Sequence, residues 1–90
     1  MIRGKNVKAV VDDIAQGYVS VNPLFLKPLT VEILGELHQG ILKAQTDVRS
    51  VGFPQGDMPA IRKRNLKLQR LMTAVTVIKT YARERRFKLV

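Results

Sequence analysis

The sequence contains no cysteine, and this absence excludes several kinds of protein chemistry. Without cysteine, the chain can form no disulfide framework, no catalytic thiolate and no zinc site with thiolate ligands. Histidine occurs once, at His38, so no second imidazole is present to complete a metal site. No apolar run approaches the roughly 18–20 residues that a membrane-spanning helix needs. We therefore expect a protein without a disulfide, a metal ion or a membrane span.

The residue patterns that accompany catalysis are also missing. His38 lies off the apolar stripe of its predicted helix, a position typical of a solvated or partly packed histidine. The adjacent Asp12 and Asp13 are poorly placed to share a cation, because neighbours on a helix point about 100° apart. The glycine-containing segment 52–56 lacks the Lys-Ser/Thr that follows in a phosphate-binding loop. We therefore predict that the protein is not an enzyme and uses no cofactor.

Acidic residues are scarce in the last third of the chain. Residues 59–90 hold ten basic side chains against the single acid Glu84, whereas residues 1–58 hold six basic and six acidic ones. The formal net charge of +9 therefore belongs entirely to residues 59–90. Such an imbalance indicates an anionic partner that docks at one end of the molecule.

The length and composition indicate one small domain, residues 1–90, with the 46% hydrophobic content of a globular protein. A chain of this length buries only about 60–65% of the surface that its unfolded form exposes, so self-association would add stability. Lys8, Asp12 and Asp13 interrupt the apolar positions near the N-terminus too early for a signal peptide. We expect a cytoplasmic protein that forms a homo-oligomer.

The apolar residues of segment 6–16 recur at helical spacing and predict a short helix that ends at Gly17. Segment 17–29 follows, and its two prolines disfavour helix in the residues that precede them. Three apolar residues lie between these prolines. We therefore expect this connector to be extended and to lie across the core.

A second helix is predicted over about residues 31–51. The Thr30 hydroxyl suits its N-cap position, and Gly52 can close it. Gly35 and Gly40 each cost about 1 kcal/mol relative to alanine inside a helix. Two interpretations remain open for them: they are tolerated on the surface, or one of them lets another helix approach closely.

A third helix is predicted over about residues 59–86. Its apolar stripe consists of Ile61, Leu68, Leu71, Met72, Val75, Ile78 and Ala82. Asp57 or Met58 caps it, and Pro59 suits its first turn. The β-branched residues of segment 71–78 would also fit a strand, but the Arg, Lys, Leu, Gln and Glu residues on both sides favour helix.

These elements predict an all-α fold: a short N-terminal helix, an extended apolar connector and a long antiparallel helical hairpin. Because the third helix is longer than the second, at roughly 40 Å against roughly 30 Å, its last two turns are predicted to overhang unless the first helix covers them. The dense basic cluster of residues 83–88 lies on that overhang.

Basic side chains of the third predicted helix form the candidate site. We predict that nucleic acid is contacted by Arg62, Lys63, Lys67, Arg70, Lys79, Tyr81, Arg83, Arg85, Arg86 and Lys88. On a helical wheel they form two patches, one toward each end, and Lys63, Lys67 and Arg70 lie opposite the apolar stripe together with Tyr81. Arginine favours phosphate because its planar fork donates two parallel hydrogen bonds. Tyr81 and Phe87, beside arginines, are predicted to stack on unpaired bases.

The leading functional prediction is a small non-enzymatic protein that binds nucleic acid mainly through phosphate, without strong sequence reading. One alternative is a structural or adaptor subunit whose basic end docks an acidic protein surface. Another is that the basic side chains simply keep an exposed helix face soluble. A helix lying on a membrane is disfavoured by the aromatic content of 6% and by the need for the apolar stripe in folding.

Segment 71–78 is apolar on more than one face, and the second helix alone cannot cover it. Two-fold interfaces are the commonest way for proteins to bury such an excess. We therefore predict a symmetric interface between copies of the chain, formed by Leu71, Met72, Ala74, Val75, Val77 and Ile78.

Overall fold

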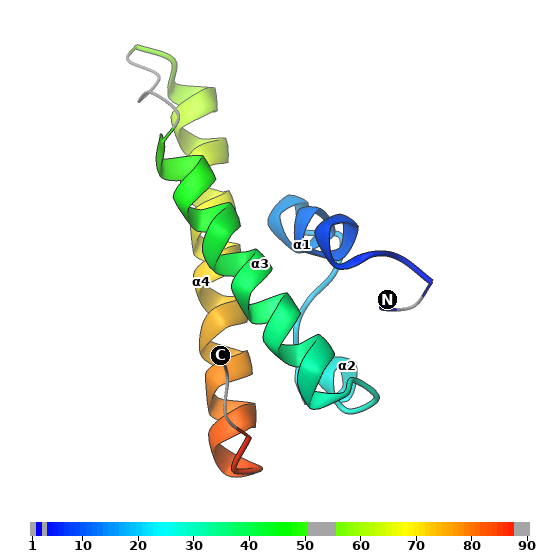
Figure 1. Ribbon diagram of the computed structural model, residues 1–90. Helices are drawn as coiled ribbons and strands as arrows, with labels where there is room; N and C mark the ends of the chain where they lie inside the picture. Colours follow the sequence, from blue (N-terminus) through cyan, green and yellow to red (C-terminus); the bar gives the residue numbers. More distant parts are fainter. Residues whose placement is uncertain (1, 3, 51–55, 88–90) are drawn as a thin grey trace.

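The computed structural model describes residues 2, 4–50 and 56–87, and the helices named next are its elements of regular secondary structure over this range. The helices are α1 (Val7–Gln16), α2 (Pro23–Leu26), α3 (Val31–Ser50) and α4 (Met58–Glu84). The long helices α3 and α4 pack side by side, and α1 and α2 lie against one side of this pair (Figure 1). The all-α prediction is confirmed, and no strand occurs in the described residues.

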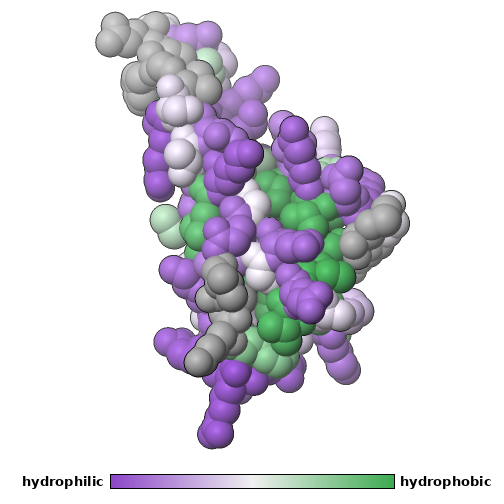
Figure 2. Space-filling model, in the orientation of Figure 1, coloured by the Kyte–Doolittle hydropathy of each residue, from purple (hydrophilic) through white to green (hydrophobic). Residues whose placement is uncertain are grey.

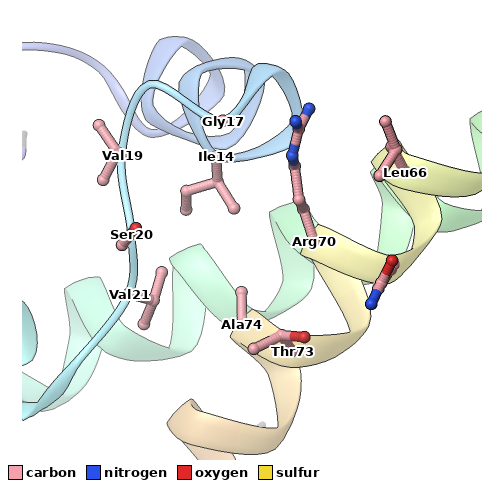
Figure 3. A pocket seen from close by; sticks show the side chains of 10 residues that line it. Ile14, Gly17, Val19, Ser20, Val21, Leu66, Arg70, Thr73 and Ala74 are labelled. Atoms are coloured by element: carbon pink, nitrogen blue, oxygen red, sulfur yellow. The ribbon is translucent and has the colours of Figure 1, made fainter. Parts of the chain in front are cut away.

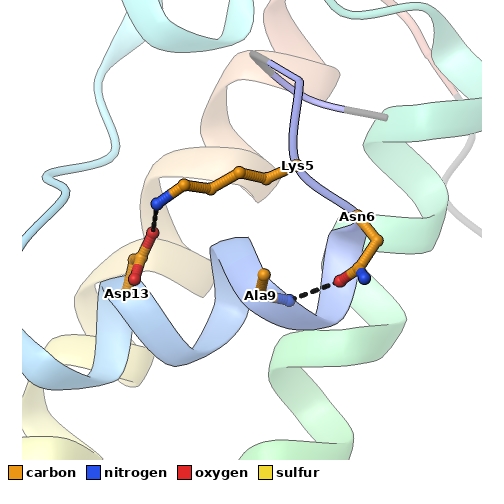
Figure 4. A network of polar contacts seen from close by, with 4 residues as sticks. All are labelled: Lys5, Asn6, Ala9 and Asp13. Carbon is orange, nitrogen blue, oxygen red and sulfur yellow. Dashed lines mark hydrogen bonds and ion pairs between the residues drawn. The ribbon is translucent and has the colours of Figure 1, made fainter.

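Hydrogen bonds at both ends fix the bounds of α1. At its start the Asn6 side chain accepts a bond from the Ala9 backbone N–H at 2.8 Å, and Lys5 Nζ lies 2.7 Å from Asp13 Oδ2 (Figure 4). At its end Gly17 adopts φ 87°, which glycine tolerates because it has no Cβ. The predicted stop at Gly17 is confirmed.

The connector differs from the prediction, because it contains the short helix α2 and is not extended throughout. The Asn22 side chain accepts a bond from the Phe25 N–H at 2.9 Å, and Pro23 occupies the first turn. Asparagine at the cap followed by proline is a helix start signal, which the sequence analysis did not use. Phe25 and Leu26 are buried, so the connector does lie across the core.

The starts of α3 and α4 follow the predicted caps. Thr30 Oγ1 accepts a hydrogen bond from the Ile33 N–H at 3.2 Å, and Asp57 Oδ1 accepts one from the Ala60 N–H at 3.1 Å. Helix α4 ends at Glu84, two residues before the predicted end. The predicted closure of α3 at Gly52 lies outside the described residues.

Gly40 marks the place where α1 approaches α3 closely. A Cβ at Gly40 would lie 3.1 Å from Val11 Cγ2, whereas nothing lies within 4 Å of a Cβ at Gly35. The two interpretations therefore each apply to one glycine: Gly40 permits the helix contact, and Gly35 is a tolerated surface position.

Burial along α4 is uneven, and this unevenness positions the candidate site. No residue between Met58 and Arg70 is buried, whereas the second half contributes six buried side chains: Leu71, Ala74, Val75, Ile78, Tyr81 and Ala82. Figure 1 shows α1 and α2 beside the middle and lower parts of the helix pair only. The first half of α4 is therefore the less covered one, and in the last two turns Tyr81 and Ala82 are buried whereas Arg83 and Glu84 are exposed.

Candidate nucleic-acid interface

The predicted basic residues lie along α4 in two groups. We call Arg62, Lys63, Lys67 and Arg70 the proximal cluster, and Lys79, Arg83, Arg85 and Arg86 the distal cluster. Arg62 and Arg83 are 21 residues apart, which corresponds to about 31 Å of helix. From Met58 to Arg83 the helix carries no acidic residue.

In the proximal cluster, the side chains nearest the start of α4 face solvent. Arg62 and Lys63 are exposed and Lys67 is half-buried. Neither Arg62 nor Lys63 pairs with an acidic side chain in the part of the chain that the structure describes. Their charge therefore remains available to an anionic partner.

Arg70 does not fit the prediction that placed it opposite the apolar stripe. Its Nη1 donates a hydrogen bond to the Ala15 carbonyl oxygen at 3.1 Å, and the side chain is half-buried. Ala74 and Tyr81, which share this side of α4, are buried. Helix α1 packs against α4, and the bond from Arg70 to Ala15 helps to hold the two helices together.

In the distal cluster, Lys79, Arg83 and Arg86 are exposed, and hydrophilic side chains project at the lower end of the molecule where α4 ends (Figure 2). Arg86 turns the chain out of the helix with φ 58°, an uncommon conformation for a residue other than glycine. Cations near a helix C-terminus are also stabilised by the helix dipole. No acidic partner is paired with these three side chains among the described residues.

Tyr81 is not accessible to a nucleobase, and this corrects the predicted stacking role. Its exposed fraction is 7%, and the Arg85 guanidinium carbon lies 4.4 Å from the ring centroid. The Phe87 ring meets the Tyr81 ring edge-on, with centroids 6.3 Å apart. Arg85 is thus engaged with Tyr81, although its side chain remains exposed. Lys88 lies outside the described residues.

Tyr18 is the aromatic residue that the sequence analysis missed. It is 79% exposed and directly follows Gly17, against which the Arg70 guanidinium lies. A left-handed glycine ends a helix and turns the chain away from it. The predicted stop at Gly17 was therefore the sequence feature that could have pointed to Tyr18 as an exposed residue. Tyr18 therefore offers an open ring face on the side of the molecule where Arg70 meets the end of α1.

The predicted interface between copies of the chain is largely used inside a single chain. Leu71, Ala74, Val75 and Ile78 are at most 5% exposed, because α1 and α3 cover them. Met72 is 51% exposed and Val77 half-buried. The argument that segment 71–78 lacks cover therefore does not hold, and self-association itself stays a prediction.

His38 is packed and not solvated. It is 7% exposed, and neither ring nitrogen has a hydrogen-bond partner among the described residues. Burial, followed by the positive charge of Lys79, lowers the pKa of His38 below its ordinary value of 6.5. No group of three potential metal ligands occurs in the described residues. None of the described helices is long and apolar enough to cross a membrane.

Comparisons with protein-family models, curated proteins and solved structures find no match for this chain. The functional argument therefore depends on the residues of the chain alone.

Proposed function

We propose that the protein binds nucleic acid through phosphate contacts made by exposed basic side chains of α4. The observation that supports this most directly is the run of basic residues from Arg62 to Arg83 with no acidic residue on the helix between them. Exposed arginines and lysines without ion-pair partners are already free to meet phosphate oxygens. Phosphate contacts position a protein on nucleic acid without reading its bases, so we expect little sequence preference.

The spacing of the two clusters suits an extended anionic partner. They span about 31 Å along α4. Between them the outer face of the helix carries neutral side chains, Met72, Thr73 and Thr76, all of which are exposed. A nucleic-acid backbone carries charge along its whole length, so a single strand or duplex can engage both clusters at once.

The salt dependence of binding tests this proposal. Each phosphate contact contributes about −0.9 to the slope of log K against log salt on duplex DNA, and about −0.7 on single strands. Replacing Lys79, Arg83 and Arg86 together with Gln should flatten the slope by about two to three units. Fluorescence anisotropy with random-sequence oligonucleotides at several salt concentrations measures this slope for the wild type and the variant.

A matched control removes the same charge elsewhere. Lys8, Lys27 and Lys43 are exposed and lie outside α4. Replacing these three with Gln should leave the slope within about one unit of the wild-type value. If both triple variants flatten the slope equally, the attraction comes from net charge alone and α4 is not the interface.

A further inference from the structure

A shallow groove runs along the less covered half of α4. Three adjoining hollows between Met58 and Thr73 all have Leu66 in their walls, and together they form what we call the α4 groove. At one end the groove lies between α4 and residues 19–21 of the connector, where it encloses about 390 Å³ (Figure 3). Between Met58 and Thr73 it is about 22 Å long, the length of four helical turns.

The α4 groove combines exposed apolar side chains with positive charge. Leu66 is 40% exposed and Met58 is 64% exposed. Arg62, Lys63 and Arg70 line the groove, and no acidic residue does. By contrast, the hollow between α1 and α3 has both acidic and basic residues in its walls. The α4 groove therefore suits an occupant that carries both apolar and acidic side chains.

Arg70 supplies an anion anchor at the end of the groove. In Figure 3 its side chain extends from α4 toward the end of α1, between Leu66 and the connector. One of its five N–H groups donates to Ala15, and the others have no hydrogen-bond partner in the described part of the chain. A guanidinium that is already fixed by one bond binds a carboxylate with little further loss of conformational entropy.

We propose that the α4 groove binds an amphipathic helix of a partner protein, with its apolar face on Leu66 and Met58 and acidic residues against Arg62, Lys63 and Arg70. A helix fits here because, among the described helices, only α3 lies beside the start of α4 (Figure 1), and a third helix would complete the bundle. The described residues offer no sheet edge for an added strand. A second copy of the chain is disfavoured by the net charge of +9.

Nucleic acid fits this groove less well than a protein helix does. No aromatic residue lines it, and the exposed Tyr18 follows the lining residue Gly17 without lining the groove, so bases inside it would find no stacking partner. A phosphate backbone would also leave Leu66 and Met58 without apolar cover. The groove and the proposed nucleic-acid surface therefore share Arg62, Lys63 and Arg70, whereas the distal cluster at the other end of α4 belongs to the nucleic-acid surface alone.

A synthetic peptide tests the proposal. The probe is a fluorescent helix of about 18 residues, long enough to cover the groove, with Leu on one face and Glu and Ala on the other. A peptide of the same composition in scrambled order keeps the charge and removes the apolar face. We expect the full-length protein to bind the amphipathic peptide at least about tenfold more tightly than the scrambled one, since burial of leucine side chains adds to the ionic attraction.

Two matched variants locate the binding. Leu66→Glu places a negative charge in the groove, and Met72→Glu places one at a comparably exposed apolar position of α4 outside it. We expect Leu66→Glu to weaken peptide binding about tenfold or more, and Met72→Glu to weaken it by less than about threefold. Neither residue is buried, so both variants should fold, and circular dichroism checks this.

Three outcomes would overturn the proposal. The first is equal binding of the amphipathic and scrambled peptides, which would show charge attraction alone. The second is an equal effect of Leu66→Glu and Met72→Glu. The third is oligonucleotide binding that Leu66→Glu weakens as strongly as peptide binding, which would make the apolar wall of the groove part of the nucleic-acid surface. By contrast, the variant in which Gln replaces Lys79, Arg83 and Arg86 tests the proposed function. If it alone loses oligonucleotide binding, the groove proposal is unaffected.

Discussion

Nη1 of Arg70 donates a hydrogen bond to the carbonyl oxygen of Ala15, 55 residues away in the sequence. The end of α1 explains why this bond forms. The N–H groups of Gly17 and Tyr18 already bond to the carbonyls of Ile14 and Asp13, the pattern of a Schellman cap. Arg70 satisfies the next carbonyl and places a positive charge at the negative end of the α1 dipole. Arg70, although it belongs to the basic residues of α4, therefore contributes to the packing of α1 against α4.

Replacing Arg70 with Gln should lower the free energy of unfolding by about 1–2 kcal/mol, because a charge-assisted hydrogen bond and a favourable dipole interaction are lost together. The matched control is Arg62→Gln, an exposed position on the same helix, which should change stability by less than about 0.5 kcal/mol. Urea unfolding followed by circular dichroism measures both. Equal effects of the two substitutions would show that the bond to Ala15 contributes nothing.

His38 should make the protein less stable in mild acid. Its pKa is lower in the folded state than in the unfolded chain, because of burial first and Lys79 second. Above about pH 6.5 the ring is neutral in both states and this contribution to stability is complete. As the pH falls through this value, the unfolded chain binds a proton that the folded one resists, so stability is lost.

The variant His38→Leu removes this titration while keeping an apolar side chain at a buried position. Between about pH 7 and pH 5, the slope of unfolding free energy against pH should be smaller for the variant than for the wild type. Urea unfolding at several pH values gives both slopes. Identical slopes would mean that His38 binds its proton equally well in the folded and unfolded states.

Tyr18 should contribute to single-strand binding. Its exposed ring can stack on a base, and such stacking is worth about 1–3 kcal/mol. Tyr18→Leu should therefore weaken binding to a random single strand about fivefold or more and leave duplex binding within about twofold. Because the residue is 79% exposed, the substitution should not affect folding. An equal loss on both substrates would count against stacking by Tyr18.

Local signals made much of the fold predictable. Three capping residues, Gly17, Thr30 and Asp57, bond to backbone groups only a few residues away. Their roles can therefore be predicted from a short stretch of sequence. The end of α1 and the starts of α3 and α4 were placed within about one residue for this reason. Helix α2 was missed because the prolines were interpreted only as helix breakers, although Pro23 follows the capping residue Asn22.

The candidate site was harder to predict because it depends on which face of α4 another element covers. Helical periodicity identified the stripe that meets α3. It could not show that Arg70 bonds to the end of α1, or that Tyr81 is buried with Arg85 and Phe87 against its ring. Arg62 and Lys63 remain exposed because the first half of α4 lacks that cover. These contacts join residues far apart in the chain, and no spacing within α4 encodes them.

The most direct test of the central claim is the binding of the unmodified protein to random-sequence oligonucleotides at about 50 mM salt, where attraction to phosphate is strong. We expect saturable binding to both single strands and duplexes, little dependence on sequence, and a marked loss of affinity at about 200 mM salt. The absence of binding at about 50 mM salt, measured by fluorescence anisotropy with folded protein, would contradict the proposal that α4 is a nucleic-acid interface.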